Sequence, residues 1–111
     1  MITIKMTWRR QPNETGLRRV GQTERGWELR MGTVDVASTH PKYRGWSREK
    51  EGYYWVARLD IPEIPLMNTA GDPVSAPGRA IKDVEDYVKK YIPNAKINRA
   101  ALTKAGIEIP K

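Results

Sequence analysis

The chain has 111 residues and a formal net charge of +7, from 20 Lys and Arg against 13 Asp and Glu. This length fits one small domain, and the balance of hydrophobic (39%) and charged (30%) residues is that of a folded protein. The absence of cysteine excludes disulfides, thiol catalysis and cysteine-based zinc sites, and no apolar run approaches the roughly 18 residues of a membrane span.

The first expected elements are strands. Apolar and polar side chains alternate from Ile2 to Trp8, which is the period of a strand with one buried face. A second alternation runs from Trp27 to Met31 and continues one residue out of phase after Gly32. A glycine at a phase change indicates either a bulge in one long strand or a tight bend between two strands.

The clearest strand signal follows a long polar segment. Residues 38–52 are polar and contain Pro41 and Gly45, so we expect a connection there. Residues 53–59 alternate and are rich in aromatic and β-branched side chains, which pack well on a pleated surface. Four prolines then predict a loop over residues 60–78.

One amphipathic helix is expected over residues 79–92, because apolar side chains recur there at helical spacing between charged ones. Ser75 is its expected N-cap, Pro77 falls in its first turn and Pro93 ends it. For residues 93–111 we expect either an irregular tail or a short helix that Asn98 caps and Gly106 ends.

This order of elements predicts an α+β fold in a single domain, residues 1–111. We expect a curled antiparallel sheet of three to four strands within residues 1–60, a loop over 61–78, and the helix packed on one face of the sheet. The other face would be basic, with Lys5, Arg30 and Arg58 projecting from it, and Arg18 as well if a short strand begins at Leu17.

Signatures of catalysis are sparse. His40 is the only histidine, and the chain has no H-E-x-x-H, G-x-S-x-G or phosphate-binding glycine-rich motif. We interpret His40, beside Pro41 in a polar segment, as an exposed loop residue. We interpret Asp83, Glu85 and Asp86 as a solvated helix face rather than a metal site. We therefore expect a protein that is not an enzyme, with no cofactor and no metal.

The basic residues suggest a polyanionic partner. Residues 1–60 carry 12 basic and 7 acidic side chains. Most of the basic residues are arginines, and aromatic residues lie between them in the sequence. Trp8, Trp27 and Trp55 lie on apolar faces and are expected in the core, whereas Trp46 is either a plug for the edge of the core or a binding anchor. The candidate residues for binding nucleic acid or a protein partner are Arg9, Arg10, Arg18, Arg19, Arg30, Arg44, Trp46, Arg48 and Arg58.

Part of the chain resembles a known family. Tyr43-Arg44-Gly45, the strand from Gly52 to Leu59 and the helix near 79–91 are similar to the AP2-type DNA-binding domain, which binds DNA through its sheet and has relatives at the start of phage integrases. The order of strands and helix also resembles the C-terminal part of double-stranded-RNA-binding domains. The AP2-type resemblance implies DNA contacts by Arg44, Arg48 and Arg58.

Two functions remain open. The first is binding of nucleic acid, or of a nucleic-acid-processing complex, through a basic sheet face and the segment 38–52. The alternative is a phage-encoded inhibitor of a host defence complex, similar in style to anti-CRISPR proteins, which acts by protein–protein contact through Trp46 and Leu66-Met67. No signal-peptide-like stretch follows Met1, so we expect a cytoplasmic location (that of the host cell, if phage-encoded) and no membrane contact.

Overall fold

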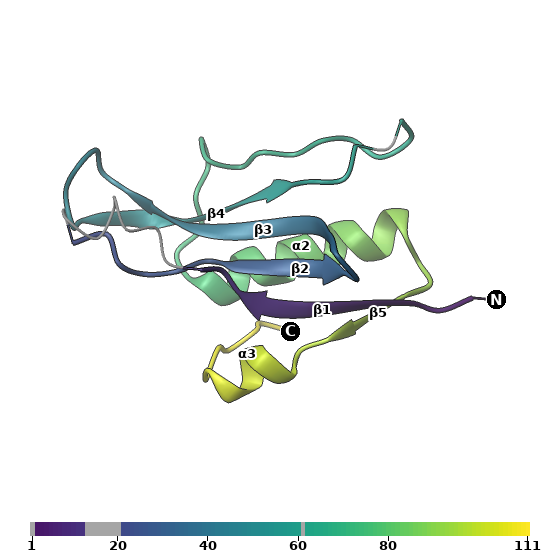
Figure 1. The fold of residues 1–111 in the computed structure, drawn as a ribbon. Coiled ribbons are helices and arrows are strands. Elements are labelled where there is room, and N and C mark those ends of the chain that lie inside the picture. Colours follow the sequence, from purple (N-terminus) through teal and green to yellow (C-terminus); the bar gives the residue numbers. More distant parts are fainter. Residues whose placement is uncertain (1, 13–20, 61) are drawn as a thin grey trace.

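The structure, a computed structural model, describes residues 2–12, 21–60 and 62–111 (Figure 1). Its described elements are, in chain order, β1 (Ile4–Arg10), β2 (Trp27–Met31), β3 (Val34–Tyr43), β4 (Lys50–Ala57), α2 (Pro77–Tyr91), β5 (Ala95–Asn98) and α3 (Ala100–Lys104). The long helix α2 lies across one face of the sheet, and α3 lies beside β1 and β5 (Figure 1). The predicted α+β class is confirmed.

The strands of the described residues form one five-stranded sheet in the order β4-β3-β2-β1-β5. Strands β1 to β4 pair in antiparallel fashion, whereas β5 runs parallel to β1, with Ile4 opposite Ala95 and Thr7 opposite Asn98. The sheet therefore has at least one strand more than the three to four that we expected, and this strand, β5, is parallel and not antiparallel to its neighbour. The four residues of β5 are too few for their alternation to stand out in the tail.

Segment 38–52, expected to be a connection, is mostly strand. β3 continues to Tyr43 and β4 begins at Lys50, so only residues 44–49 join them. Pro41 is tolerated because it lies beyond Thr39, the last β3 residue that pairs with β2. The polar side chains of this segment reflect a sheet face that neither of the described helices covers, and the expectation of a long loop was wrong.

The phase change near Gly32 has two causes. Gly32 has a φ of 62° in the two-residue turn between β2 and β3, where a left-handed conformation favours glycine. The register also shifts between Leu29 and Arg30, which pair with Ala37 and Asp35 and leave Val36 as an extra residue. Of the two alternatives, the tight bend is therefore correct at Gly32, and a bulge follows it in β3.

The core lies between the sheet and α2. The three tryptophans predicted for it are buried, with Trp8, Trp27 and Trp55 at 0%, 4% and 5% exposure. The ring of Trp55 lies 5.0 Å, centroid to centroid, from that of Tyr87 on α2. Large aromatic side chains bury much apolar surface, so these contacts fix α2 on this face of the sheet.

The helix ends differ slightly from the predictions. α2 begins at Pro77, which agrees with the predicted place of this proline in the first turn. The N-cap residue, however, is Ala76 and not the expected Ser75. In the tail, Asn98 Oδ1 accepts a hydrogen bond of 2.8 Å from the Ala100 N–H at the start of α3. In the described ranges, neither helix has the length and apolar character needed to cross a bilayer.

The proline-rich segment after β4 covers the outer edge of that strand. Val56 forms a bridge with Asn68, and Tyr53 forms one with Val74. These isolated bridges occupy backbone groups that an exposed edge strand would otherwise leave unpaired. Residues 68–70 are thereby held beside β4.

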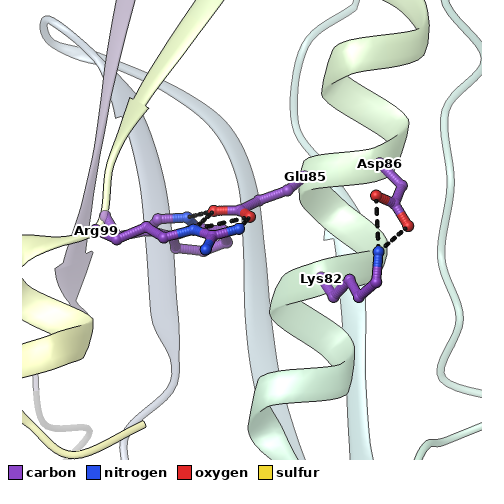
Figure 2. Close-up of polar contacts among 5 residues, drawn as sticks. Lys82, Glu85, Asp86 and Arg99 are labelled. Atoms are coloured by element: carbon purple, nitrogen blue, oxygen red, sulfur yellow. Dashed lines mark hydrogen bonds and ion pairs between the residues drawn. The ribbon is translucent and has the colours of Figure 1, made fainter. Parts of the chain in front are cut away.

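A buried carboxylate joins the sheet, α2 and the tail (Figure 2). Glu85 of α2 is 2% exposed and accepts a hydrogen bond of 3.0 Å from Trp8 Nε1 of β1. Arg99, between β5 and α3, reaches the same carboxylate with Nε at 3.0 and 3.1 Å and also donates through its terminal nitrogen. The expectation that Glu85 belongs to a solvated helix face is wrong, because its position on α2 faces inward.

We predict that Arg99→Ala lowers the free energy of unfolding by about 3 kcal/mol, because it leaves the buried Glu85 carboxylate without its ion pair. Lys82→Ala is the matched control, since Lys82 pairs with Asp86 on the exposed side of the same helix (Figure 2) and should cost at most about 0.5 kcal/mol. Urea unfolding measures both. Equal costs for the two variants would contradict the role given to Glu85.

We also predict that Gly78→Ala destabilises the fold by about 1–3 kcal/mol. A Cβ on Gly78, in the first turn of α2, would overlap the backbone carbonyl oxygen of Glu108 in the tail. Gly71→Ala is the control, because a Cβ there meets no atom within 4 Å, and its effect should be neutral or slightly stabilising. Thermal unfolding measures the stability of both variants, and limited proteolysis measures the sensitivity of the tail. Unchanged protease sensitivity of the tail in Gly78→Ala would refute the close packing of Gly78 against Glu108.

Candidate nucleic-acid interface

The face of the sheet opposite α2, here called the open face, is set by strand register. Cross-strand partners share a face, so residues paired out of phase with the core tryptophans project away from α2. The open face comprises Lys5, Thr7 and Arg9 of β1, Glu28 and Arg30 of β2, Asp35, Ser38, His40 and Lys42 of β3, and Tyr54 and Val56 of β4, with Arg58 just beyond.

The end of the open face over β1 and β2 is locally neutralised. Arg9 is ion-paired with Glu28, which is buried, and Arg30 NH1 lies 3.7 Å from Glu28 and 3.0 Å from Asp35. Two arginines thus meet two carboxylates. The uniformly basic face that the sequence suggested is interrupted here, because Glu28 and Asp35 share this face with the arginines.

A groove of about 640 Å³ occupies the other end of the open face. β3 and β4 line it with His40, Lys42, Tyr54 and Val56. Segment 22–26 lines it as well, together with Arg58 and residues that flank the outer edge of β4. Its volume is that of a site for one small ligand or one segment of a chain.

His40 lies inside this groove and does not belong to an exposed loop. Its Nε2 is 2.8 Å from Ser38 Oγ, which in turn accepts a hydrogen bond of 3.1 Å from Arg58 Nε. Burial, and then the nearby Arg58 guanidinium, lower the pKa of His40 from 6.5 to about 4. His40 is therefore neutral at physiological pH, and the hydroxyl of Ser38, which is itself buried, holds Arg58 and His40 in place.

The turn over residues 44–49 presents Trp46 to solvent. Trp46 is 78% exposed, which excludes a role as a plug for the core. Gln22, itself buried, donates hydrogen bonds to the carbonyl oxygens of Gly45 at 2.9 Å and Ser47 at 2.8 Å on either side of it. The tryptophan therefore projects from a braced turn at the end of the groove that Gly45 lines.

The two arginines of the turn differ in their surroundings. Arg44 lies 3.8 Å from Glu49 and 3.7 Å from Glu51, in exposed pairs that cost little to break. Arg48 lies against the backbone of Gly21, where an added Cβ would meet its side chain. Among the described residues, no carboxylate oxygen lies within 4.0 Å of Arg48.

The predicted residues do not form one patch. Arg10 lies on the face opposite to Arg9, with its guanidinium carbon 4.4 Å from the Trp27 ring centroid at the edge of the core. Arg18 and Arg19 lie outside the described residues. The eight residues of β4 separate Arg58 from the 44–49 turn, roughly 26 Å along the strand.

Sequence reasoning missed much of the groove. Gln22, Arg25, His40, Lys42, Tyr54 and Asn68 all line it and were not among the candidates. Alternation from Tyr53 to Leu59 places Tyr54 and Arg58 on the same face, so this signal was present in the sequence. The pairing of Tyr54 with His40 depends on β3 continuing past Ser38 into the segment that was expected to be a connection, which composition did not indicate.

Comparison of the chain with protein-family models, with curated proteins and with solved structures finds no match in any of the three.

We predict that His40 makes stability depend on pH. The unfolded chain takes up a proton at His40 near pH 6.5 and the folded chain only near pH 4, so the free energy of unfolding falls as the pH drops through this window. In His40→Gln this contribution is absent. Urea titrations from pH 7 to pH 4 should therefore show the stability gap between the two proteins shrink; a constant gap would contradict a partly buried, neutral imidazole.

Proposed function

We propose that this protein is a non-enzymatic nucleic-acid-binding protein, which holds a phosphate backbone along the groove of its open face and the 44–49 turn. The observation that carries the proposal is the set of arginines that line the groove or lie in the 44–49 turn. For Arg25, Arg48 and Arg58, no described carboxylate lies within ion-pair distance. Cations without an intramolecular partner are those that can neutralise phosphates at low cost.

The position of these arginines supports the proposal further. Arg25 and Arg58 line the groove, and Arg58 is steadied through its Nε by Ser38. A guanidinium held at Nε still presents its terminal nitrogens in a planar fork, which matches the geometry of phosphate oxygens. Lys42 lines the same groove. Its Nζ donates a hydrogen bond to the Ala70 carbonyl oxygen and lies 3.9 Å from the Glu51 carboxylate.

The exposed Trp46 fits the same function. Aromatic rings beside basic grooves stack on bases while the cations track the backbone. The net charge of +7 adds long-range attraction for a polyanion, which speeds encounter and makes affinity fall with salt. The proposed site of action is the cytoplasm, of the host cell if the chain is phage-encoded, which the lack of cysteine suits.

A second candidate function is supported by the same tryptophan. A tryptophan that projects from a braced turn is also the kind of anchor that dominates protein–protein interfaces. Leu66 and Met67, at 62% and 38% exposure, add apolar surface beyond β4. In this alternative the protein binds a nucleic-acid-processing complex, as an anti-CRISPR-like inhibitor of host defence would, and has little affinity for nucleic acid itself.

We predict that Arg58→Ala weakens nucleic-acid binding and lowers the slope of log affinity against log salt by about 0.7 to 0.9, the share of one phosphate contact. The matched control is Arg79→Ala, an exposed arginine on α2 on the other side of the sheet, which should change neither quantity. Fluorescence anisotropy with labelled single-stranded DNA, duplex DNA and duplex RNA measures both quantities.

Two results would count against nucleic-acid binding. Negligible affinity for all three probes at about 150 mM salt would favour the protein-binding alternative. Equal effects of Arg58→Ala and Arg79→Ala would mean that the charge acts without regard to its position.

A further inference from the structure

The groove on the open face contains an aromatic pair as well as charge. His40 and Tyr54 are cross-strand partners on β3 and β4, and their ring centroids lie 5.2 Å apart. Both residues line the groove and both are only partly buried. Rings that project from neighbouring strands into a groove offer a surface on which a flat ligand can stack.

We propose that this groove is a subsite for one unpaired base of single-stranded nucleic acid and for the phosphates beside it, with the base stacked on Tyr54 and His40. The inference rests on the proposed function and names its preferred ligand. In a duplex, neighbouring bases cover both faces of each base, so a stacking ring selects bases that are unpaired. A volume of about 640 Å³ also suits one nucleotide better than a double helix.

Different residues of the groove supply the stacking surface and the positive charge. His40 stays neutral at physiological pH because its pKa is lowered to about 4, so it contributes an aromatic face and no cation. Arg58 contributes the charge beside it, held by Ser38 at 3.1 Å. The flanking phosphates would then lie against Arg58 on one side of the base and Lys42 or Arg25 on the other, since all three line the groove.

A polar side chain in the groove can read the edge of the base. Asn68 Oδ1 accepts a hydrogen bond of 3.0 Å from the Ala70 N–H, which orients the amide and assigns its NH₂ group as a donor. Asn68 lines the groove from the segment that flanks β4. A donor at this position favours a base that presents a carbonyl oxygen, which thymine, uracil, cytosine and guanine have and adenine lacks.

The test compares three labelled probes at about 150 mM salt by fluorescence anisotropy: an oligothymidine, the same strand with abasic sites at its central positions, and a duplex of the same length. Loss of stacking should weaken binding of the abasic strand at least about fivefold, as expected for about 1 kcal/mol or more per base. Tyr54→Leu should lose the same factor on the intact strand and little more on the abasic strand. Tyr91→Leu, on α2, is the matched aromatic control and should behave as the unmodified protein.

Each outcome bears on one of the two proposals. Equal affinity for the intact and abasic strands, or tighter binding of the duplex, overturns the base subsite while nucleic-acid binding stands. Absence of binding to every probe overturns the proposed function itself. The comparison of intact and abasic strands uses the unmodified protein, so equal affinities would overturn the base subsite even if Tyr54→Leu fails to fold. Tyr54→Leu and a parallel Trp46→Leu variant then tell stacking in the groove from stacking on the turn.

Discussion

The burial of the Glu85 carboxylate is the interaction on which the arrangement of layers depends. A charged group at 2% exposure is tolerated only if it is paired, and its partners come from two distant parts of the chain, Trp8 of β1 and Arg99 after β5. This contact holds α2 and the tail against the same side of the sheet (Figure 2). The only long helix of the described residues is thereby committed to that side, and no helix of the described residues covers the opposite face.

The charges of the open face divide into two groups with different roles. Over β1 and β2, Arg9 and Arg30 are ion-paired with Glu28 and Asp35, and of these four side chains only Glu28 is buried. Around the groove, Arg25 and Arg58 meet no described carboxylate and can meet phosphates instead. The arginines that contribute to the net charge of +7 therefore include some that are held in ion pairs and some that are candidates for binding. Only their positions in the fold distinguish the two kinds.

The sequence predicted what depends on local pattern and missed what depends on pairing between distant segments. Alternation located β1, β2 and β4, helical spacing located α2, and the core tryptophans followed from both. The continuation of β3 through Pro41, the parallel strand β5 and the burial of Glu85 all require a partner far away in the chain, which composition does not show. The prediction was least complete for the candidate site, because the β3–β4 register alone brings His40 next to Tyr54.

The central claim is that the open face, and not the helical face, is the binding surface. Backbone amide chemical shifts of the isotope-labelled protein, followed as a single-stranded oligonucleotide is added, test it most directly. We expect shifts in β3, β4 and the 44–49 turn, centred on His40, Tyr54 and Arg58, with α2 unchanged. Shifts concentrated in α2 or α3, or none at saturating oligonucleotide, would contradict it.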